Sequence, residues 1–221
     1  MKRVVVQEMI DTGEGTPQEI FDSLTDMRWS NRWFGGDSTA LSLLRKVVAR
    51  SGVNRLKVLE TGSGLGDVPL RAQKSLRSAG VHLDVTLLDR AEGHLGRGAQ
   101  SVVGDALALP FRDGAFDVVS CCLFAHHLEP CGILAYANEA LRVSRRAVVI
   151  NDLVRHPLHY ALACAGRFVY RSRLSRHDAP VSVRRAYTVA EMSTMLRASR
   201  AAQVEVSGRY LYRMGAIAWK H

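Results

Sequence analysis

Residues 58–69 have the sequence Val-Leu-Glu-Thr-Gly-Ser-Gly-Leu-Gly-Asp-Val-Pro, and this stretch decides the fold. An apolar run stops at Glu60, three glycines follow at every second position, and a helical pattern begins behind them. A strand that ends in a glycine-rich turn and opens a helix brings backbone N–H groups close to a nucleotide-like ligand. A dinucleotide fingerprint that starts at Gly62 would need its third glycine at position 67, which is Asp67 here. The stretch therefore predicts an α/β protein whose ligand differs from a dinucleotide.

Segments with strand and helix patterns alternate on both sides of this turn. Parallel strands are predicted at residues 56–60, 82–88, 99–103, 116–122 and 147–153, with helices at residues 37–50, 66–79, 91–95 and 130–143. Thr188 and Glu191 have the spacing of a capping box that starts a last helix, and residues 204–210 and 212–219 suit an antiparallel hairpin. The alternation predicts a doubly wound, mostly parallel seven-stranded α/β sheet with an antiparallel C-terminal hairpin.

The length and composition fit one domain with a real core. The chain has 221 residues, of which 47% are hydrophobic and 23% charged. No signal peptide or transmembrane stretch is recognised, and the four cysteines lack zinc or C-x-x-C spacing, so we expect reduced thiols and a cytoplasmic protein.

Two segments lie outside the alternating strand and helix pattern. We expect residues 1–36 to form an N-terminal lid and residues 154–187 an inserted acceptor-binding segment.

The charge is unevenly distributed along the chain. Residues 1–140 carry 15 Lys and Arg against 17 Asp and Glu, whereas residues 141–221 carry 15 against 4, a net charge of +11. Such a bias could serve nucleic acid, an anionic membrane surface or an acidic substrate. We favour a solvated surface, because the arginines are scattered among apolar residues instead of forming a basic tail.

The acid before the glycines gives the order E-x-G-x-G-x-G, which resembles motif I of the class I S-adenosylmethionine (SAM)-dependent methyltransferases. Residues 104–111, 116–119 and 125–128 resemble the methyltransferase type 11 family, which includes the ubiquinone/menaquinone C-methyltransferases and many natural-product O-methyltransferases. The resemblance covers residues 55–153 and implies a Rossmann-like methyltransferase fold with SAM as cofactor. These motifs say nothing about the acceptor.

The parts of SAM can be assigned to residues at successive strand ends. The glycine turn lets the backbone approach the methionine and ribose, Asp89 can accept from both ribose hydroxyls, and Asp105 with Ala106 can contact the adenine edge. Each of these motifs alone could simply be a helix cap or a turn, but here they occur together and in chain order. The predicted cofactor-binding residues are Glu60, Gly62, Ser63, Gly64, Gly66, Asp89, Arg90, Asp105, Ala106, Ser120 and Cys121.

Catalysis of methyl transfer needs positioning and, for an oxygen acceptor, removal of a proton. His126 and His127 follow the strand at residues 116–122, and Asp152 ends the next strand. We expect one of these histidines to be the base, with Asp152 orienting an imidazole or the acceptor. The alternative for the histidine pair is local capping of its loop. No metal site is predicted, because only Asn151 and Asp152 stand where a metal-dependent enzyme would cluster its acids and amides.

Candidate acceptor-binding residues lie outside the motifs and are harder to assign: Trp29, Trp33, Arg155, His159 and His177. The tryptophans could equally pack over the fold, and a structural hydrogen bond is favoured for His177 with Asp178. A solvated turn is slightly favoured for Arg184 and Arg185. The apolar face of a predicted helix at residues 158–170 is expected to pack in the core, ahead of acceptor binding or docking at a membrane surface.

These observations favour O-methylation of a small aromatic or polyketide-like acceptor in secondary metabolism. Alternatives are C-methylation of a quinol, methylation of RNA through the basic C-terminal region, and SAM binding without catalysis. Nucleic acid ranks below a small molecule, because residues 120–123 lack the Asn/Asp-Pro-Pro-Tyr/Phe motif common in base methylation. Peripheral membrane contact is compatible with the sequence, and the oligomeric state is left open.

Overall fold

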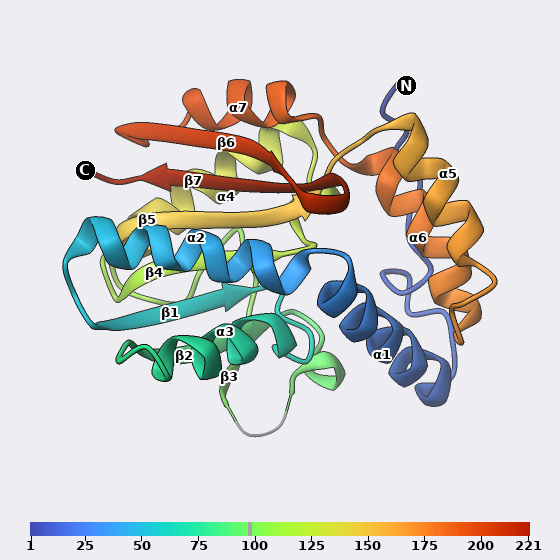
Figure 1. Ribbon diagram of the computed structural model, residues 1–221, viewed down its shortest axis with the longest axis horizontal. Coiled ribbons are helices and arrows are strands. Elements are labelled where there is room, and N and C mark those ends of the chain that lie inside the picture. The colour runs from blue at the N-terminus through green and yellow to red at the C-terminus, as the bar shows by residue number, and fades with distance from the viewer. Residues whose placement is uncertain (97–98) are drawn as a thin grey trace.

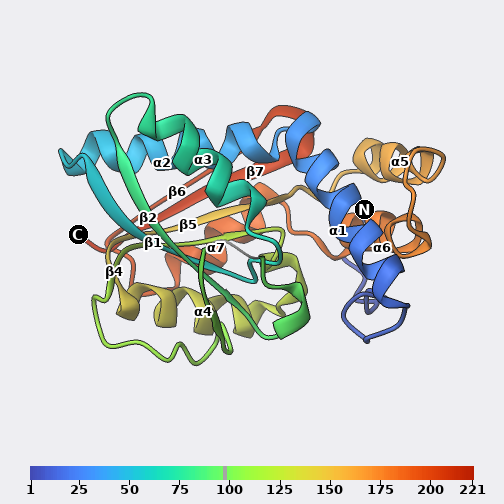
Figure 2. The same cartoon turned by 90° about the horizontal axis from the view of Figure 1, so that it is seen from below.

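The computed structural model describes residues 1–96 and 99–221 and contains a twisted sheet between two layers of helices (Figures 1 and 2). Its strand order is β3-β2-β1-β4-β5-β7-β6, and β7 runs antiparallel to both of its neighbours while the other pairs are parallel. The seven strands found in these residues are β1 (Arg55–Thr61), β2 (His82–Asp89), β3 (Gln100–Val103), β4 (Phe116–Cys122), β5 (Ser144–Leu153), β6 (Gln203–Arg209) and β7 (Arg213–Trp219). The predicted doubly wound sheet with a C-terminal hairpin is confirmed.

Helices cover both faces of the sheet, as right-handed crossovers between parallel strands require. One face is covered by α2 (Gly36–Ser51) and α3 (Asp67–Arg77), and the other by α4 (Pro130–Val143) and α7 (Val189–Arg197) (Figure 2). Buried apolar residues of these helices form a core on each side, with Leu43 and Val47 on the first and Tyr136 and Leu196 on the second. The interior strand β5 is buried on both faces from Ala147 to Asp152, which explains its continuous apolar pattern.

Three further helices lie beyond the carboxyl ends of the parallel strands, where Figure 1 shows them gathered at one end of the molecule. They are α1 (Pro17–Trp33), α5 (Pro157–Gly166) and α6 (Arg173–Arg185), and short 3₁₀ turns η1 (Glu92–His94), η2 (Ala125–His127) and η3 (Tyr210–Tyr212) lie in the connections. The capping boxes at Thr16 with Glu19 and at Thr188 with Glu191 are both formed, and they fix the starts of α1 and α7.

The segment 154–187 differs from the sequence expectation in two ways. First, α5 ends at Gly166, and its apolar face is not core: Leu158 is 53% exposed and Leu162 is 50% exposed. Second, α6 was not predicted, because it contains Pro180, which cannot donate the helical hydrogen bond. The helix still forms because the hydroxyl of Ser172 caps its start and accepts from Leu174 N.

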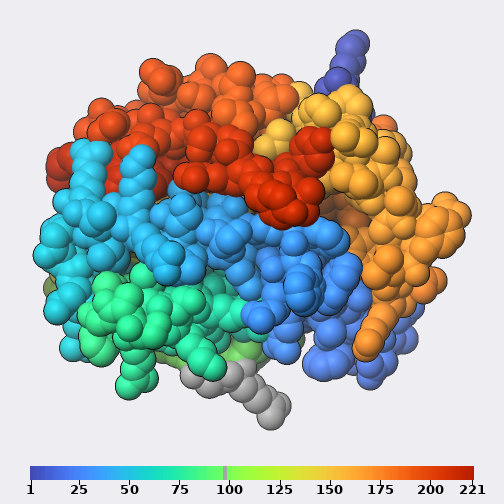
Figure 3. Space-filling model, viewed as in Figure 1, coloured from blue at the N-terminus to red at the C-terminus, as the bar shows by residue number. Residues whose placement is uncertain are grey.

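The N-terminal segment and the 154–187 segment hold each other in place. The carboxylate of Asp26 accepts from the backbone N–H groups of Arg171 and Ser172, and the carboxylate of Asp178 accepts from those of Met9 and Ile10. In Figure 3, the blue atoms of α1 lie beside the orange atoms of this segment. Together they form a cover over the carboxyl ends of the strands. In the described ranges no helix is both long and apolar enough to cross a membrane.

Candidate functional site

The glycine turn after β1 needs glycine for two different reasons. Gly62, Gly64 and Gly66 have φ angles of 59°, 49° and 71°, in the left-handed region that other residues avoid. A Cβ on Gly62 would lie 2.5 Å from the Phe124 ring, so that position is closed by packing. A Cβ on Gly64 would meet only Leu24, at 3.8 Å, so this side of the turn faces open space.

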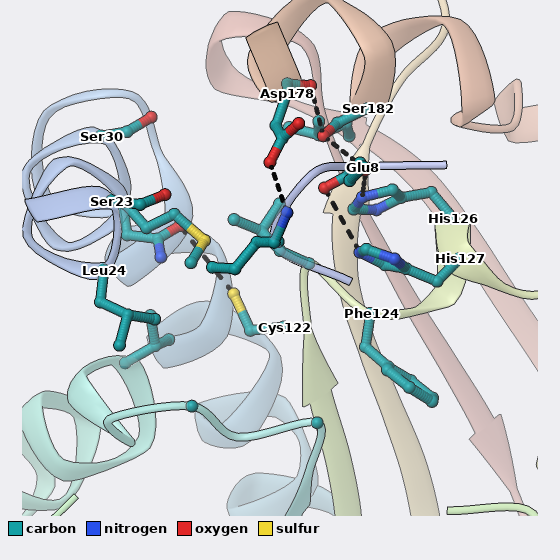
Figure 4. A pocket seen from close by; sticks show the side chains of 18 of the residues that line it. Glu8, Ser23, Leu24, Ser30, Cys122, Phe124, His126, His127, Asp178 and Ser182 are labelled. Carbon is teal, nitrogen blue, oxygen red and sulfur yellow. Dashed lines mark hydrogen bonds and ion pairs between the residues drawn. The ribbon is translucent and has the colours of Figure 1, made fainter. Parts of the chain in front are cut away.

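That open space is a cavity of about 800 Å³ between the strand ends and their cover. The glycine turn, Asp89 and Asp105 form one part of its wall, and residues 8, 11, 126 and 127 form another. Figure 4 shows the close approach of these elements, with Leu24 of α1 near the turn and the histidine pair across the cavity. A cavity at the carboxyl ends of the strands is where a doubly wound sheet binds its ligands. Its volume lies within the roughly 300–1,000 Å³ typical of small-molecule sites.

Asp89 and Asp105 shape the cavity wall through hydrogen bonds to the backbone. Asp89 accepts from Gly64 N at 2.9 Å and from Ala91 N at 3.0 Å, so it fixes the glycine turn while keeping lone pairs for a ligand. Asp105 accepts from Leu107 N at 2.8 Å. Most of the predicted cofactor-binding residues line this cavity: Glu60, Gly62, Ser63, Gly64, Gly66, Asp89, Arg90, Asp105 and Ala106.

Two predicted cofactor-binding residues lie elsewhere, and their assignment needs correction. Ser120 and Cys121 are buried within β4, because this strand continues to Cys122. The side chains that reach the cavity wall from the end of β4 are those of Cys122, Leu123 and Phe124. Leu123 has a left-handed φ of 56°, where its N–H donates to Asn151 O and the chain leaves the sheet.

Glu60 is a buried acid at the foot of the cavity, with 4% of its surface exposed. Burial raises its pKa from 4.5 to about 7, and the hydrogen bond donated by the Ser120 hydroxyl opposes that rise only in part. The carboxyl group therefore changes charge near neutral pH. As a carboxylate it can pair with a cationic ligand group, and as a protonated acid it can form a hydrogen bond with a neutral one.

Glu60→Gln is expected to remove a pH dependence of stability. Burial raises the pKa of Glu60 from 4.5 to about 7. The contribution of its neutral carboxyl group to the free energy of unfolding is therefore fully present below pH 4.5 and is lost as the pH rises through 7. The loss amounts to about 3 kcal/mol. Urea unfolding at pH 5 and pH 8 measures it: the wild-type chain should lose more stability between these pH values than Glu60→Gln does. Glu14→Gln, an exposed control that keeps Glu60, should lose as much stability as the wild type. Equal pH slopes in the wild type and Glu60→Gln would contradict the prediction.

Across the cavity, two histidines of η2 meet acids from three separate segments. His126 Nδ1 lies 2.6 Å from Asp152 Oδ1 at the end of β5, and His127 Nδ1 lies 2.7 Å from Asp11 Oδ2. Glu8 faces both rings, with one carboxylate oxygen 3.3 Å from His126 Nε2 and the other 3.8 Å from His127 Nε2 (Figure 4). The two ring centroids are 4.3 Å apart.

The surroundings of His126 assign it a different role from that of His127. Burial alone would lower the pKa of His126, but Asp152 and Glu8 outweigh burial and raise it to about 10. Without a ligand, His126 is therefore a buried imidazolium between carboxylates and is unsuited to accept a proton. The same contacts lower the pKa of Asp152 and Glu8 despite their burial. His126 was a candidate base from the sequence, and this protonation state is evidence against that role.

Of the predicted acceptor-binding residues, Trp29 and His159 line the cavity and three do not. Trp33 is 62% exposed at the end of α1. Arg155 is buried and donates to Met1 O, Ala186 O and Glu191, so it ties the cover together. His177 pairs with Asp178 at 2.8 Å, which is the structural hydrogen bond favoured from the sequence.

Several residues of the site carry no signal in the sequence. Glu8 and Asp11 lie in irregular structure and a turn before α1, and only the folded chain brings them to the histidines. Arg185, expected in a solvated turn, is instead buried and donates to His127 O at 3.0 Å. Arg185 also pairs with Asp11 at 3.5 Å, so it supports the acid that holds His127.

Comparison with known proteins supports the expected family. Residues 59–149 match the family model described as "Methyltransferase domain". No curated protein matches the chain. The family match spans β1 to β5 and so contains the glycine turn and the strand ends that form the cofactor side of the cavity.

Solved structures with a similar fold cover most of the chain. The plantazolicin methyltransferase BpumL, in complex with a triazolic desmethylPZN analog and SAH, has 14% identity and a TM-score of 0.68 over 89% of each chain. The magnesium protoporphyrin IX methyltransferase from Synechocystis PCC 6803, with bound SAH, has 16% identity and a TM-score of 0.58 over 91% of this chain and 96% of that one. The citrinin polyketide synthase CMeT domain has 11% identity and a TM-score of 0.54 over 75% of this chain and 46% of that one.

Proposed function

We propose that this chain is a class I SAM-dependent methyltransferase, and that it transfers the methyl group to a hydroxyl of a small aromatic or polyketide-like acceptor. One observation carries the proposal. A single cavity joins the glycine turn and Asp89 on one side to an apolar wall and an acid–histidine cluster on the other. The cavity can therefore hold a cofactor and a second small molecule at once.

The cofactor side of the cavity fits SAM. The turn leaves an open cradle at Gly64 that a Cβ would enter, and Asp89 retains acceptor capacity for two ribose hydroxyls. Glu60, buried near the turn, can meet the α-ammonium group as a carboxylate. When bound, SAM supplies an electrophilic methyl group on its sulfonium. The chain must then position an acceptor in line with that group and take up its proton.

His127 is the residue we assign to proton removal. Its Nδ1 donates to Asp11, so Nε2 carries the lone pair. Glu8 lies 3.8 Å from Nε2 and would stabilise the imidazolium once a proton arrives. His126 and Asp152 are positioning residues, because they hold η2 and Glu8 without a free basic nitrogen of their own.

The remaining wall indicates an acceptor that is mostly apolar. Met27 and Trp29 from α1, Leu162 from α5, and Val169 and Tyr170 beyond it line the cavity. Apolar and aromatic walls bind flat or extended hydrophobic molecules, and a few polar groups then fix the orientation. Ser30 supplies one such polar group, and the histidine cluster supplies the other.

The charge distribution in the structure disfavours RNA as acceptor. Four arginines of the basic C-terminal part pair with acids of the first 140 residues, so these four side chains are already engaged within the fold. These pairs are Arg142 with Asp113 and Glu139, Arg146 with Asp117, Arg173 with Glu19, and Arg185 with Asp11. Arginines engaged in this way contribute little to a phosphate-binding face.

Methyl-labelled SAM incubated with the protein is expected to label organic-soluble small molecules and leave total RNA unlabelled. A ¹³C label would show whether the product carries a methoxy group or a C-methyl group by NMR, which separates O-methylation from quinol C-methylation. Asp89→Ala protein is the control for label that arrives without bound cofactor. Label in RNA, or only C-methyl products, would overturn the acceptor assignment.

A further inference from the structure

We propose that Glu8, His126 and His127 form a binding site for a divalent transition metal, with zinc as the best match. One ring nitrogen from each histidine and one carboxylate oxygen of Glu8 all lie within 4.8 Å of one another. Two histidines and one carboxylate are the protein ligands of a common class of catalytic zinc site, which leaves a fourth position for water or substrate. This inference goes beyond the proposed function, which needs no metal.

The distances between these atoms match the edges of such a site. A zinc ion with bonds of about 2.0–2.1 Å in tetrahedral geometry separates its ligand atoms by about 3.3 Å. His126 Nε2 lies 3.3 Å from Glu8 Oε1, and His127 Nε2 lies 3.8 Å from Glu8 Oε2, so the two carboxylate oxygens each face one imidazole at about this separation. Figure 4 shows both rings turned with their Nε2 edges toward Glu8, so only small movements would complete the coordination.

Each proposed ligand is held from behind by a second polar group. Asp152 accepts from His126 Nδ1 at 2.6 Å, and Asp11 accepts from His127 Nδ1 at 2.7 Å. The Ser182 hydroxyl donates to Glu8 at 2.8 Å. Carboxylates on the far nitrogen of metal-bound histidines fix the tautomer so that Nε2 is the free ligand atom. Both histidines of this pair have that arrangement.

A buried polar atom without a partner independently points to a missing ligand. His126 is 2% exposed, and no group among the described residues forms a hydrogen bond with its Nε2. The Glu8 oxygen at 3.3 Å is close enough for an ion pair but is not aligned for a hydrogen bond. An orphaned buried nitrogen is costly, and a metal ion midway between Nε2 and the carboxylate would satisfy it.

The local charge also suits a dication. Three carboxylates contact the two imidazoles, those of Glu8, Asp11 and Asp152, and Arg185 pairs with one of them. If both imidazoles are neutral, the three carboxylates and the one guanidinium group give the cluster a net charge of −2. A divalent ion would balance it.

The open coordination position would face the cavity, because Glu8, His126 and His127 all line it. A bound metal lowers the pKa of a coordinated hydroxyl, so the metal would take over from His127 the activation of an oxygen acceptor. The same cavity side would then favour acceptors with a metal-binding oxygen, such as a phenol. Sequence reasoning missed the site because Glu8 is distant from the histidines in the chain.

Cobalt(II) titration of the full chain, freed of metal with a chelator, tests the proposal. One cobalt ion per chain should bind with the visible spectrum of a four-coordinate complex, and zinc should displace it. Glu8→Gln keeps the hydrogen bond to Ser182 but removes a ligand charge, and it should weaken binding at least tenfold. Asp11→Asn should weaken binding by about 10- to 100-fold through His127.

The control is His159→Gln, which changes another histidine of the same cavity and should leave the cobalt affinity unaltered. Thermal melting of each metal-free variant shows that it is folded. Absence of cobalt binding to the wild-type chain, or binding that Glu8→Gln leaves unchanged, would overturn the proposal. The proposed function can fail independently of this site. In that case the chain would transfer no methyl group with or without metal, but cobalt would still bind.

Discussion

Asp89→Ala is expected to weaken SAM binding at least a hundredfold and to abolish methyl transfer at ordinary SAM concentrations. The carboxylate stands at the end of β2, lines the cavity and already fixes Gly64 N at 2.9 Å. A hydrogen bond to a charged group contributes about 1.5–3 kcal/mol, so losing two to the ribose corresponds to about 3–6 kcal/mol. Each 1.4 kcal/mol changes the affinity tenfold. Calorimetric titration of SAM into the variant measures the loss.

Asp84→Ala is the matched control for this experiment. Asp84 lies on the same strand at its opposite end, where it pairs with Arg55 at 2.9 Å on the surface. Its removal should leave SAM affinity unchanged. Wild-type affinity in folded Asp89→Ala would show that the ribose lies elsewhere and would remove the cofactor assignment for this strand end.

Asp152→Ala is expected to destabilise the metal-free chain by about 3–5 kcal/mol. Asp152 is 1% exposed and accepts from the Nδ1 and the backbone N–H of His126. Removing one partner of a buried ion pair leaves the other charge without compensation, which costs far more than losing a surface pair. Urea unfolding in the presence of a chelator measures the difference. Asp113→Ala removes an 80% exposed carboxylate that pairs with Arg142, and this change should cost less than about 1 kcal/mol.

The pH dependence of this effect follows from the two shifted groups. The pKa of Asp152 is lowered against the effect of burial, chiefly by His126, so its contribution is present above pH 3.8 and is lost as the pH falls further. The pKa of His126 is raised from 6.5 to about 10, so its contribution is full below pH 6.5 and lost as the pH rises through 10. The cost of Asp152→Ala should therefore be largest between about pH 4 and 6.5. A cost below 1 kcal/mol at pH 6 would contradict the buried ion pair.

The sheet and its cofactor side could be predicted because their signals are local. Strand β4 and helix α4 have the bounds expected from apolar patterns alone, residues 116–122 and 130–143. The glycine turn and Asp89 follow from the rule that ligands bind at the carboxyl ends of parallel strands. Ser120 and Cys121 do not line the cavity because β4 runs on to Cys122, and the cavity wall at this strand end is formed by Cys122 and the two residues after it.

The acceptor side could not be predicted, because tertiary contacts build it. His126 and His127 were singled out, but Glu8 and Asp11 reach them from an irregular N-terminal stretch that no periodicity marks. Likewise, Pro180 and a high content of arginine concealed α6, whose buried Arg185 supports the cluster. The identity of the site depends on these contacts between segments far apart in the chain.

The most direct test of the cofactor site is calorimetric titration of SAM into Gly64→Ala beside Gly80→Ala. Both glycines have a left-handed φ, 49° and 76°, so both substitutions strain the backbone similarly. A Cβ on Gly64 would enter the cavity near Leu24, whereas a Cβ on Gly80 would have no described residue other than its chain neighbours within 4 Å. If the turn cradles SAM, Gly64→Ala should lose at least tenfold in affinity while Gly80→Ala matches the wild type. Equal affinities in all three proteins would contradict the assignment of this cavity to SAM.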